Sequence, residues 1–301
     1  MKVLLCAFSG TGNTMIATHK LASFFEQEGH EVTIYQVTRP YENIPDPNEY
    51  DVVGLGYPIH AFNAPQIFVR FCKRLPKVEN KKTFFYKTSG EPFRPNNASS
   101  YFCYKALKKK GYHCIMDVHM LMPYNIMFRY KDGLAKQMYI YTKATCQLIV
   151  KRILNDEEDK LRYNIFTIIW ALMLRLQWFG AWILGPTIHA KKKLCTKCGA
   201  CAAKCPSHNI KMTEKGPKFG WHCTMCMGCT FRCPQDALRP GFLNPWRVNG
   251  LYPYAQVLKD KEKPPVYITK ETKGYFKLFL KYYQKLDTIF ASYGITIDED
   301  L

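Results

Sequence analysis

The stretch of sequence that decides the fold reads Cys195-x-x-Cys198-x-x-Cys201-x-x-x-Cys205-Pro206, and then Cys223-x-x-Cys226-x-x-Cys229-x-x-x-Cys233-Pro234. These two runs hold eight of the 13 cysteines, and every position of the second run lies 28 residues after its counterpart in the first. Three cysteines with two residues between neighbours place their thiols around one metal group in a short curled loop, while the fourth cysteine, followed by proline, reaches a different metal group. The repeat therefore predicts two equivalent metal sites.

The spacing C-x₂-C-x₂-C-x₃-C-P is that of [4Fe–4S] cluster sites in which the fourth cysteine binds the other cluster. By this rule one cluster is held by Cys195, Cys198, Cys201 and Cys233, and the other by Cys223, Cys226, Cys229 and Cys205. The alternative is a pair of structural zinc sites, because zinc also binds C-x-x-C. Zinc takes its ligands from two separated pairs, and no histidine stands in register here, so the pattern favours clusters.

The cysteine-rich stretch resembles the bacterial two-cluster ferredoxin domain, including the Asn209-Ile210 and Ala237-Leu238 pairs that follow each Cys-Pro. The resemblance implies a small α+β two-[4Fe–4S] ferredoxin-like domain, which we expect at residues 194–241. At 301 residues the chain is about twice the length of a typical domain, so a second domain is expected.

The N-terminal end carries a different signal. An apolar run at 3–8 leads into Ser9-Gly10-Thr11-Gly12-Asn13-Thr14 and then into a helical stretch to about Glu28. A strand that ends in a glycine- and hydroxyl-rich turn at a helix N-terminus is typical of a phosphate site. The turn is neither a Walker A motif nor a dinucleotide G-x-G-x-x-G.

Four more stretches read as strands, at 32–37, 51–57, 82–88 and 113–122, and they alternate with helical stretches near 65–75, 98–110 and 134–154. Five βα units predict an α/β fold with a doubly wound parallel five-stranded sheet over residues 1–155, with its ligand at the C-terminal strand ends. Here the chain resembles the flavodoxins, because the loop at 9–14 matches their S/T-x-T-G-x-T phosphate fingerprint.

This resemblance implies bound FMN. The phosphate would lie on Ser9, Gly10, Thr11, Gly12, Asn13 and Thr14, and the ring on Tyr57, Pro58, Ile59, His60, Ala61, Phe62 and Asn63 together with Ser89, Gly90 and Glu91. Tyr57, Phe62 and Phe93 are candidates to stack on the ring, and core packing is the alternative for each of them.

Two further segments lie outside both resemblances. In the connector, residues 156–193, the stretch 165–184 is apolar except for a narrow stripe at Asn164, Thr167, Ala171 and Arg175, which predicts a buried or interfacial helix rather than a membrane span. The extension, residues 242–301, contains a basic amphipathic helix with lysines at 273, 277, 281 and 285. We expect the two helices to bury each other or to fill the seam between the domains; the alternative is contact with an anionic membrane.

The formal charge of +19 falls to roughly +13 if each cluster contributes about −2 and the flavin phosphate about −2. This charge favours acidic redox partner proteins or anionic lipid, and no nucleic-acid module is visible. The short apolar run at the N-terminus indicates a strand rather than a signal peptide, and the cluster ligands indicate a reducing cytoplasm. We expect the remaining thiols to be buried and inert: Cys6, Cys72, Cys103, Cys114 and Cys146.

In this order the two halves look like the flavodoxin–ferredoxin fusion proteins of anaerobic prokaryotes. The resemblance implies electron transfer between FMN and two [4Fe–4S] clusters and onward to redox partners, with no catalytic residue in the chain itself. One alternative is an FMN-dependent oxidoreductase acting on a small substrate, with His60 or Glu91 as proton donor and the clusters as electron feed. Another is a docking module whose flavodoxin-like half no longer binds FMN.

Overall fold

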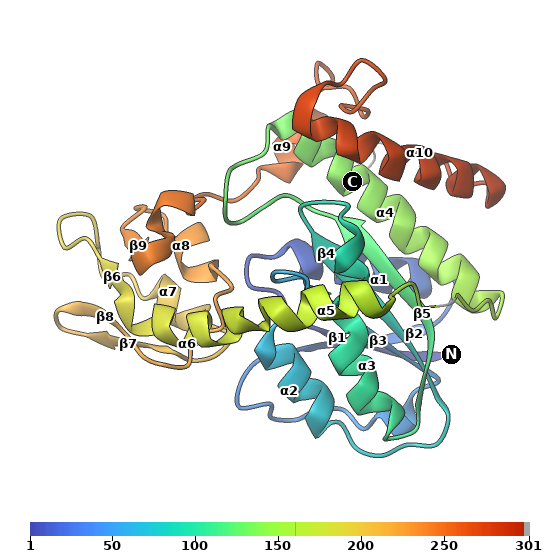
Figure 1. Cartoon of the computed structure of the whole chain (residues 1–301), viewed down its shortest axis with the longest axis horizontal. Helices are drawn as coiled ribbons and strands as arrows, with labels where there is room; N and C mark the ends of the chain where they lie inside the picture. Colours follow the sequence, from blue (N-terminus) through green and yellow to red (C-terminus); the bar gives the residue numbers. More distant parts are fainter. Residues whose placement is uncertain (160, 298–301) are drawn as a thin grey trace.

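Five parallel strands form the central sheet in the order β2-β1-β3-β4-β5 (Figure 1). The structure is a computed structural model that describes residues 1–159 and 161–297. The strands are β1 Lys2–Ala7, β2 Glu31–Gln36, β3 Val52–Pro58, β4 Lys81–Ser89 and β5 Tyr112–Leu121. Strands β1 and β3 are apolar and buried along most of their length, as expected in the middle of a parallel sheet. The strand order is that of flavodoxin-like doubly wound sheets, so the predicted fold class is confirmed.

Helices cover both faces of the sheet. Helices α1, Asn13–Gln27, and α4, Asp132–Leu154, pack on one face, and α2, Gln66–Arg74, and α3, Tyr101–Lys108, pack on the other. The 3₁₀ segments η1, Pro47–Glu49, and η2, Arg94–Ser100, lie in the connecting loops. All five cysteines outside the two runs are buried, as predicted, and burial raises the pKa of the Cys6 and Cys146 thiols.

The cysteine-rich unit consists of two short antiparallel strand pairs and two single-turn helices. Strand β6, Ile188–Ala190, pairs with β9, Leu238–Pro240, and β7, Ile210–Thr213, pairs with β8, Gly216–Phe219. Helices α7, Ala200–Ala203, and α8, Gly228–Phe231, each carry one cysteine of a run. Because β6 belongs to this unit, the unit begins before the predicted boundary at residue 194.

The backbone of this unit repeats with the same displacement as its cysteines. Left-handed residues occur at equivalent positions of the two copies: Lys197 and Met225, Gly199 and Met227, His208 and Asp236. Five of these six residues are not glycine, and for them a left-handed conformation is disfavoured unless the surroundings impose it. The two cysteine loops therefore have the same shape.

The connector is an almost continuous helix made of α5, Ile165–Met173, η3, Leu174–Leu176, and α6, Gln177–Thr187. It begins with a capping box between Asn164 and Thr167 and runs from the flavodoxin-like domain to the cysteine-rich unit (Figure 1). The sequence predicts a buried or interfacial helix for this segment. Only 22% of its most apolar window is buried, so the buried form of that prediction is wrong.

The C-terminal extension returns to the flavodoxin-like domain. It contains η4, Gly241–Trp246, α9, Tyr254–Lys259, η5, Gly274–Phe276, and α10, Lys277–Ser292. Helix α10 packs Phe279, Tyr283 and Phe290 against α4, and the hydroxyl of Tyr141 donates to Asp287 at 2.7 Å. The two apolar helices therefore do not bury each other, which corrects the first form of the prediction. The four lysines of the basic stripe, Lys273, Lys277, Lys281 and Lys285, are exposed.

Candidate flavin and cluster sites

The eight cysteines of the two runs line two separate cavities. The inner cluster cavity is lined by Cys205, Cys223, Cys226 and Cys229, and the outer cluster cavity by Cys195, Cys198, Cys201 and Cys233. This is the crossed grouping that the cysteine spacing predicts. Among the described residues, no three His, Cys, Asp or Glu side chains converge on a point that a single metal ion would fill. Each set of four thiols surrounds a volume instead.

Backbone amides point at the sulfur atoms of these cavities. The N–H of Asn209 lies 3.3 Å from Cys205 Sγ, and at the equivalent position of the repeat the N–H of Ala237 lies 3.2 Å from Cys233 Sγ. Such bonds favour ionised sulfur and help to set a cluster's potential. Burial raises the pKa of Cys226 to about 12, so a bound metal is needed to ionise it at neutral pH. The donor set therefore fits thiolate-held clusters.

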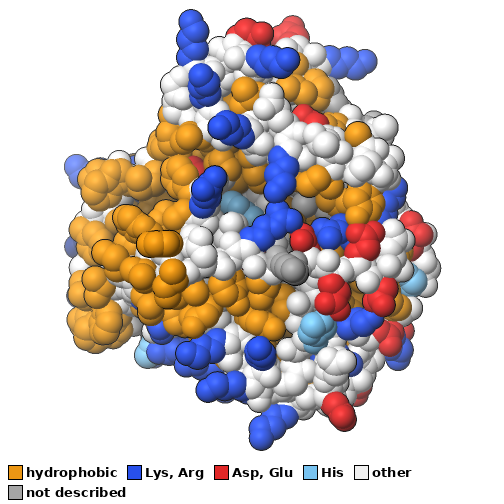
Figure 2. All heavy atoms as spheres, turned by 45° about the vertical axis from the view of Figure 1, so that its right-hand side comes forward, with side chains coloured by type: hydrophobic (Ala, Val, Ile, Leu, Met, Phe, Trp, Pro, Cys, Tyr) orange, Lys and Arg blue, Asp and Glu red, His pale blue; other side chains and the backbone are white. Residues whose placement is uncertain are grey.

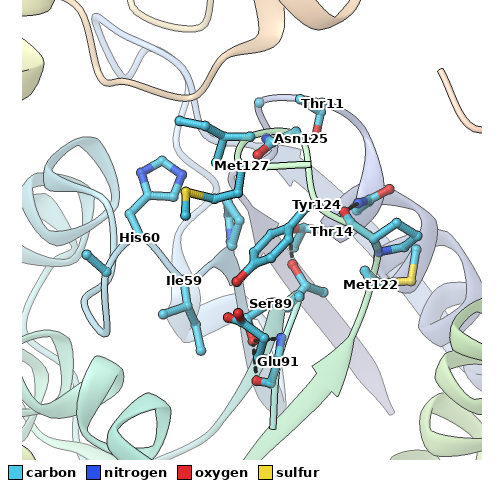
Figure 3. A pocket seen from close by; sticks show the side chains of 18 of the residues that line it. Thr11, Thr14, Ile59, His60, Ser89, Glu91, Met122, Tyr124, Asn125 and Met127 are labelled. Carbon is cyan, nitrogen blue, oxygen red and sulfur yellow. Dashed lines mark hydrogen bonds between the residues drawn. The ribbon is translucent and has the colours of Figure 1, made fainter. Parts of the chain in front are cut away.

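A third cavity, the sheet-edge cavity, opens at the C-terminal ends of the strands and has a volume of about 360 Å³ (Figure 3). Its walls come from the loops after β1, β3, β4 and β5, with Gln177 of α6 and Met225 of the cysteine-rich unit completing them. Both its size and its position are those expected of a small-molecule site in a doubly wound sheet.

The loop after β1 has the geometry of an anion site. Gly12 caps α1 with a φ of 113°, a conformation that favours glycine, and its N–H donates to Ser9 Oγ at 3.1 Å. The first turn of α1 contains no acidic residue, so its N–H groups and the positive end of its dipole face the loop unopposed. The hydroxyl of Thr11 is held by Asn125 Nδ2 at 3.2 Å, and that of Thr14 by Thr88 Oγ1 at 2.8 Å. These residues fit a phosphate group.

Aromatic and acidic side chains form the other end of the cavity. Tyr124 extends its ring across the cavity with its hydroxyl toward Ser89 and Glu91 (Figure 3). The Glu91 carboxylate accepts a hydrogen bond from Tyr275 of η5, so the C-terminal extension reaches this wall. Burial, followed by the Glu91 carboxylate, raises the pKa of Tyr124. Burial lowers the pKa of His60 to about 4, so its ring is neutral at pH 7 and is no ready proton donor.

A buried ion pair supports the loop after β4. Lys87 Nζ lies 2.9 Å from Asp117 Oδ1, and both side chains are almost fully buried. Ser100 Oγ donates to Asp117 at 2.6 Å, and Lys87 Nζ donates to the carbonyl of Asn96 at 3.3 Å. Asn96 in turn donates to the carbonyl of Glu91 at 2.8 Å. The charge pair in the sheet thus holds the loop that carries Glu91.

Most of the residues predicted to bind flavin line the sheet-edge cavity: Ser9, Gly10, Thr11, Asn13, Thr14, Pro58, Ile59, His60, Ala61, Phe62, Ser89, Gly90 and Glu91. Tyr57 does not. It is fully buried on the α2 side of the sheet, 4.9 Å from Phe68 between ring centroids, and its hydroxyl lies 3.2 Å from Ser99 Oγ. The stacking role considered for Tyr57 is therefore corrected to core packing.

Asn63 is also outside the cavity. Its side-chain amide is buried and donates to the carbonyls of Ala61 at 3.0 Å and Ala171 at 2.8 Å. Asn63 therefore shapes the loop after β3 and anchors α5, rather than contacting the cavity. Gly12 acts in a comparable way, by turning the phosphate loop without lining the cavity itself.

Sequence reasoning missed the segment 122–127 after β5, which supplies Tyr124, Asn125 and Met127 to the cavity. The signal was available, because the C-terminal ends of all parallel strands meet at one edge of the sheet. It also missed Asn96 and Gln177, which come from segments with no motif of their own, and Met225, which lies between two cysteines of the second run. Phe62 and Phe93 line the cavity edge-on to each other, with centroids 6.4 Å apart.

The sheet-edge cavity and the inner cluster cavity share a wall. Met225 lines both of them. On the same seam, a Cβ placed on Gly10 would lie 2.4 Å from the Cβ of Cys226 and 3.1 Å from its Sγ. A side chain at position 10 would therefore force the two domains apart, and glycine permits the loop at 9–14 to touch Cys226 directly.

Two polar side chains cross this seam. Asn125 donates both to Thr11 Oγ1 and to the carbonyl of Cys226, each at 3.2 Å. Arg232, from the loop after α8, brings a guanidinium nitrogen to 3.6 Å from the position a Gly12 Cβ would take. Half-burial lowers the pKa of Arg232, which nevertheless stays charged near neutral pH. The cysteine-rich unit thus places a cation beside the phosphate loop.

Comparison with known proteins agrees with this division of the chain. Residues 187–234 match a family described as a 4Fe–4S dicluster domain. No curated protein sequence matches the chain. Similar solved structures include oxidised Flavodoxin 2 from Bacillus cereus, at 14% identity and a TM-score of 0.37 over 52% of this chain and 99% of that one. Flavodoxin 1 from the same organism has 14% identity and a TM-score of 0.35, with coverage of 50% and 98%.

A further similar structure is the general stress protein 14 of Treponema denticola in complex with FMN, at 11% identity and a TM-score of 0.38 over 51% of this chain and 99% of that one. Since all three TM-scores are below 0.5, the fold assignment rests on the strand order. Taken together, the strand order and the family match show that the chain joins a domain of flavodoxin-like fold to a 4Fe–4S dicluster domain.

Proposed function

We propose that this protein transfers electrons between FMN, bound in the sheet-edge cavity, and two [4Fe–4S] clusters, and passes them onward to redox partners. The observation that carries the proposal is the shared wall, where Met225 lines both cavities and Gly10 touches Cys226. FMN exchanges one or two electrons and each cluster exchanges one, so their combination converts between two-electron and one-electron chemistry. The residues of the chain bind these groups and fix their separation.

For FMN, the loop at 9–14 would hold the phosphate through the N–H groups of α1 and the hydroxyls of Thr11 and Thr14. Tyr124 would lie against the ring, with Ile59 and Met127 excluding water from the same part of the cavity (Figure 3). The positive charge of Arg232 beside Gly12 would favour the phosphate further.

For the clusters, α7 keeps the two cavities close together. Cys201 lies on this helix and faces the outer cluster cavity, whereas Cys205, directly after the helix, faces the inner one. Cys229 on α8 and Cys233 after it show the same division in reverse. Since one helical turn separates the two sets of ligands, a cluster in each cavity would stand beside the other.

The proposed exit for electrons is the outer cluster cavity. Cys198 in its wall is exposed, and so are the neighbouring Lys197 and Lys204. A basic surface around an exposed cluster ligand favours an acidic redox protein as partner, because opposite charges accelerate encounter. We place the protein in a reducing cytoplasm, where cluster thiolates persist.

The competing function is an FMN-dependent oxidoreductase with the clusters as electron feed. The Glu91 carboxylate and the Tyr124 hydroxyl at the cavity favour this alternative, because both groups are able to orient a small polar substrate. Steady-state assays with a reduced viologen dye and candidate substrates distinguish the two functions. Turnover of a small molecule that is lost in Glu91→Gln would favour the oxidoreductase.

Anaerobic reconstitution with iron, sulfide and FMN tests the proposal. We expect about eight irons and eight acid-labile sulfides, since two complete four-thiolate sites are present. We also expect FMN rather than FAD to bind. Stoichiometric zinc under strict anaerobiosis would overturn the cluster assignment, and riboflavin binding as tightly as FMN would overturn the phosphate role of the loop. A protein with clusters but no affinity for FMN would instead be a docking module.

A further inference from the structure

The connector helix exposes most of its apolar side and buries small and polar positions. Its small and polar positions Thr167, Ala171, Ala181 and Gly185 are buried against the protein. Most of its large apolar side chains face solvent, with exposed fractions of 72% for Phe166, 72% for Leu176 and 69% for Phe179. The exceptions are Leu184, which is buried in the cysteine-rich unit, and Trp178, which packs against the flavodoxin-like core. In a soluble protein the apolar side of a helix normally faces the core. An exposed apolar face of this length therefore indicates an interaction surface.

The inner stripe ties this helix to both domains. Asn63 holds the carbonyl of Ala171 at 2.8 Å, and Gln177 donates to the carbonyl of His60. At the other end, a Cβ on Gly185 would lie 2.2 Å from the carbonyl oxygen of Gly220, so the helix backbone is in direct contact with the cysteine-rich unit. Because these contacts use the small and polar side of the helix, its apolar side stays outward.

The exposed apolar surface extends beyond the helix. Trp182 of α6 packs on Trp221 with ring centroids 4.7 Å apart, and both rings are about half exposed. Helix α6 also contacts η4, where Phe242 and Trp246 are exposed. Figure 2 shows a broad hydrophobic band on this side of the molecule, with Lys and Arg side chains along its borders. We call the surface formed by α5, η3, α6, Trp221 and η4 the apolar band.

The sequence stretch that contains the connector helix carries charges of one sign. Residues 161–213 contain eight Lys or Arg and no Asp or Glu. Lys191, Lys192 and Lys193 follow β6 and are exposed, and the exposed Arg162 stands before α5, where it pairs with Asp159 at 2.8 Å. Long basic side chains at both ends of an apolar helix, together with exposed tryptophans, are the features of helices that lie at the surface of an anionic bilayer. A second copy of a chain with a charge of +19 would be repelled rather than attracted.

We propose that the apolar band docks the protein on anionic membranes, with the connector helix lying in the plane of the lipid headgroups. By length and composition, Ile165–Thr187 would also suffice to cross a bilayer. Crossing would require the helix to leave the contacts with His60, Asn63 and Gly220, whereas lying in the plane keeps all of them. The apolar residues then enter the acyl boundary, and the flanking lysines meet the headgroup phosphates.

The test uses the full-length, cofactor-loaded protein and vesicles of phosphatidylcholine with or without phosphatidylglycerol. The wild-type protein is expected to sediment with phosphatidylglycerol vesicles, to release in high salt or alkaline carbonate, and to show tryptophan quenching by brominated lipid. Phe166→Ser/Phe179→Ser is expected to lower vesicle affinity by at least tenfold. Replacing Lys191, Lys192 and Lys193 by Gln is expected to weaken binding and flatten its salt dependence.

The matched control is Leu278→Ser, which removes a half-exposed leucine from α10, away from the apolar band. This variant should bind vesicles like the wild type, and all variants should keep their cluster and flavin spectra. Three results would overturn the proposal: no vesicle binding by the wild type, equal loss in the control, or resistance to carbonate extraction, which indicates a spanning helix. A wild-type dimer without lipid that Phe179→Ser converts to a monomer would assign the band to a second copy instead.

Discussion

Replacing Gly10 with alanine tests the seam between the phosphate loop and the inner cluster cavity. The new Cβ would lie 2.4 Å from the Cβ of Cys226 and 2.7 Å from its carbonyl oxygen. Carbon atoms in ordinary contact are separated by about 3.5 Å, so the seam must open by about 1 Å. Neither contacting atom is the end of a flexible side chain, and overpacking of this kind destabilises proteins by about 1–3 kcal/mol.

We therefore expect the Gly10→Ala variant to unfold at a lower urea concentration than the wild type. We also expect slower electron transfer from flavin to cluster, because opening the seam lengthens the distance between the flavin and the inner cluster. The assay is flash reduction of the flavin in the loaded protein, with cluster bleaching followed by absorbance. Gly133→Ala is the matched control: its Cβ would lie 2.7 Å from the ring of Tyr267, away from the seam, so it should lose stability but keep the transfer rate. A Gly10→Ala protein with full cluster content and a wild-type transfer rate would refute the reasoning.

Other variants probe the flavin site and its support. Thr11→Ala and Thr14→Ala should each weaken FMN binding by roughly 1–3 kcal/mol in fluorescence titrations while leaving riboflavin binding unchanged, and a parallel loss for riboflavin would contradict a phosphate role. Arg232→Gln should weaken the binding of FMN, but not of riboflavin, by roughly 1 kcal/mol. An unchanged affinity for FMN would show that Arg232 does not contribute to phosphate binding. Lys87→Met should reduce the free energy of unfolding by about 3–5 kcal/mol, because the Asp117 carboxylate stays buried without its partner; recovery in Lys87→Met/Asp117→Leu checks that cause.

The parts of the structure that follow from local spacing were predictable. The prediction of a doubly wound parallel five-stranded sheet needed only the alternation of apolar runs with helical stretches, since right-handed crossovers leave few arrangements of a parallel sheet. The division of Cys201 and Cys205 between two cavities follows from their spacing, because Cys201 lies on α7 and Cys205 lies just after it. Likewise, a hydroxyl-rich turn before α1 had to lie at the C-terminal edge of the sheet.

The parts that depend on distant partners were not predictable. Tyr57 lies near the end of β3, and whether its side chain faces the cavity or the core depends on the helices that cover that face. Tyr124 follows β5 in a segment without a motif. The thin polar stripe of the connector suggested a helix buried on its apolar side. In the structure, Asn63, distant in sequence, binds the carbonyl of Ala171, and Thr167 and Ala171 of that stripe face inward.

Flash reduction of the flavin in two cysteine variants tests the central claim that electrons pass directly from FMN to the cluster in the inner cavity. Cys205→Ser removes a ligand of that cluster, and Cys233→Ser removes a ligand of the outer one. Iron content and electron paramagnetic resonance establish which cluster each variant has lost. The account predicts a first transfer step whose rate is independent of protein concentration, that persists in Cys233→Ser and that disappears in Cys205→Ser. A first step that survives in Cys205→Ser and is lost in Cys233→Ser would contradict it.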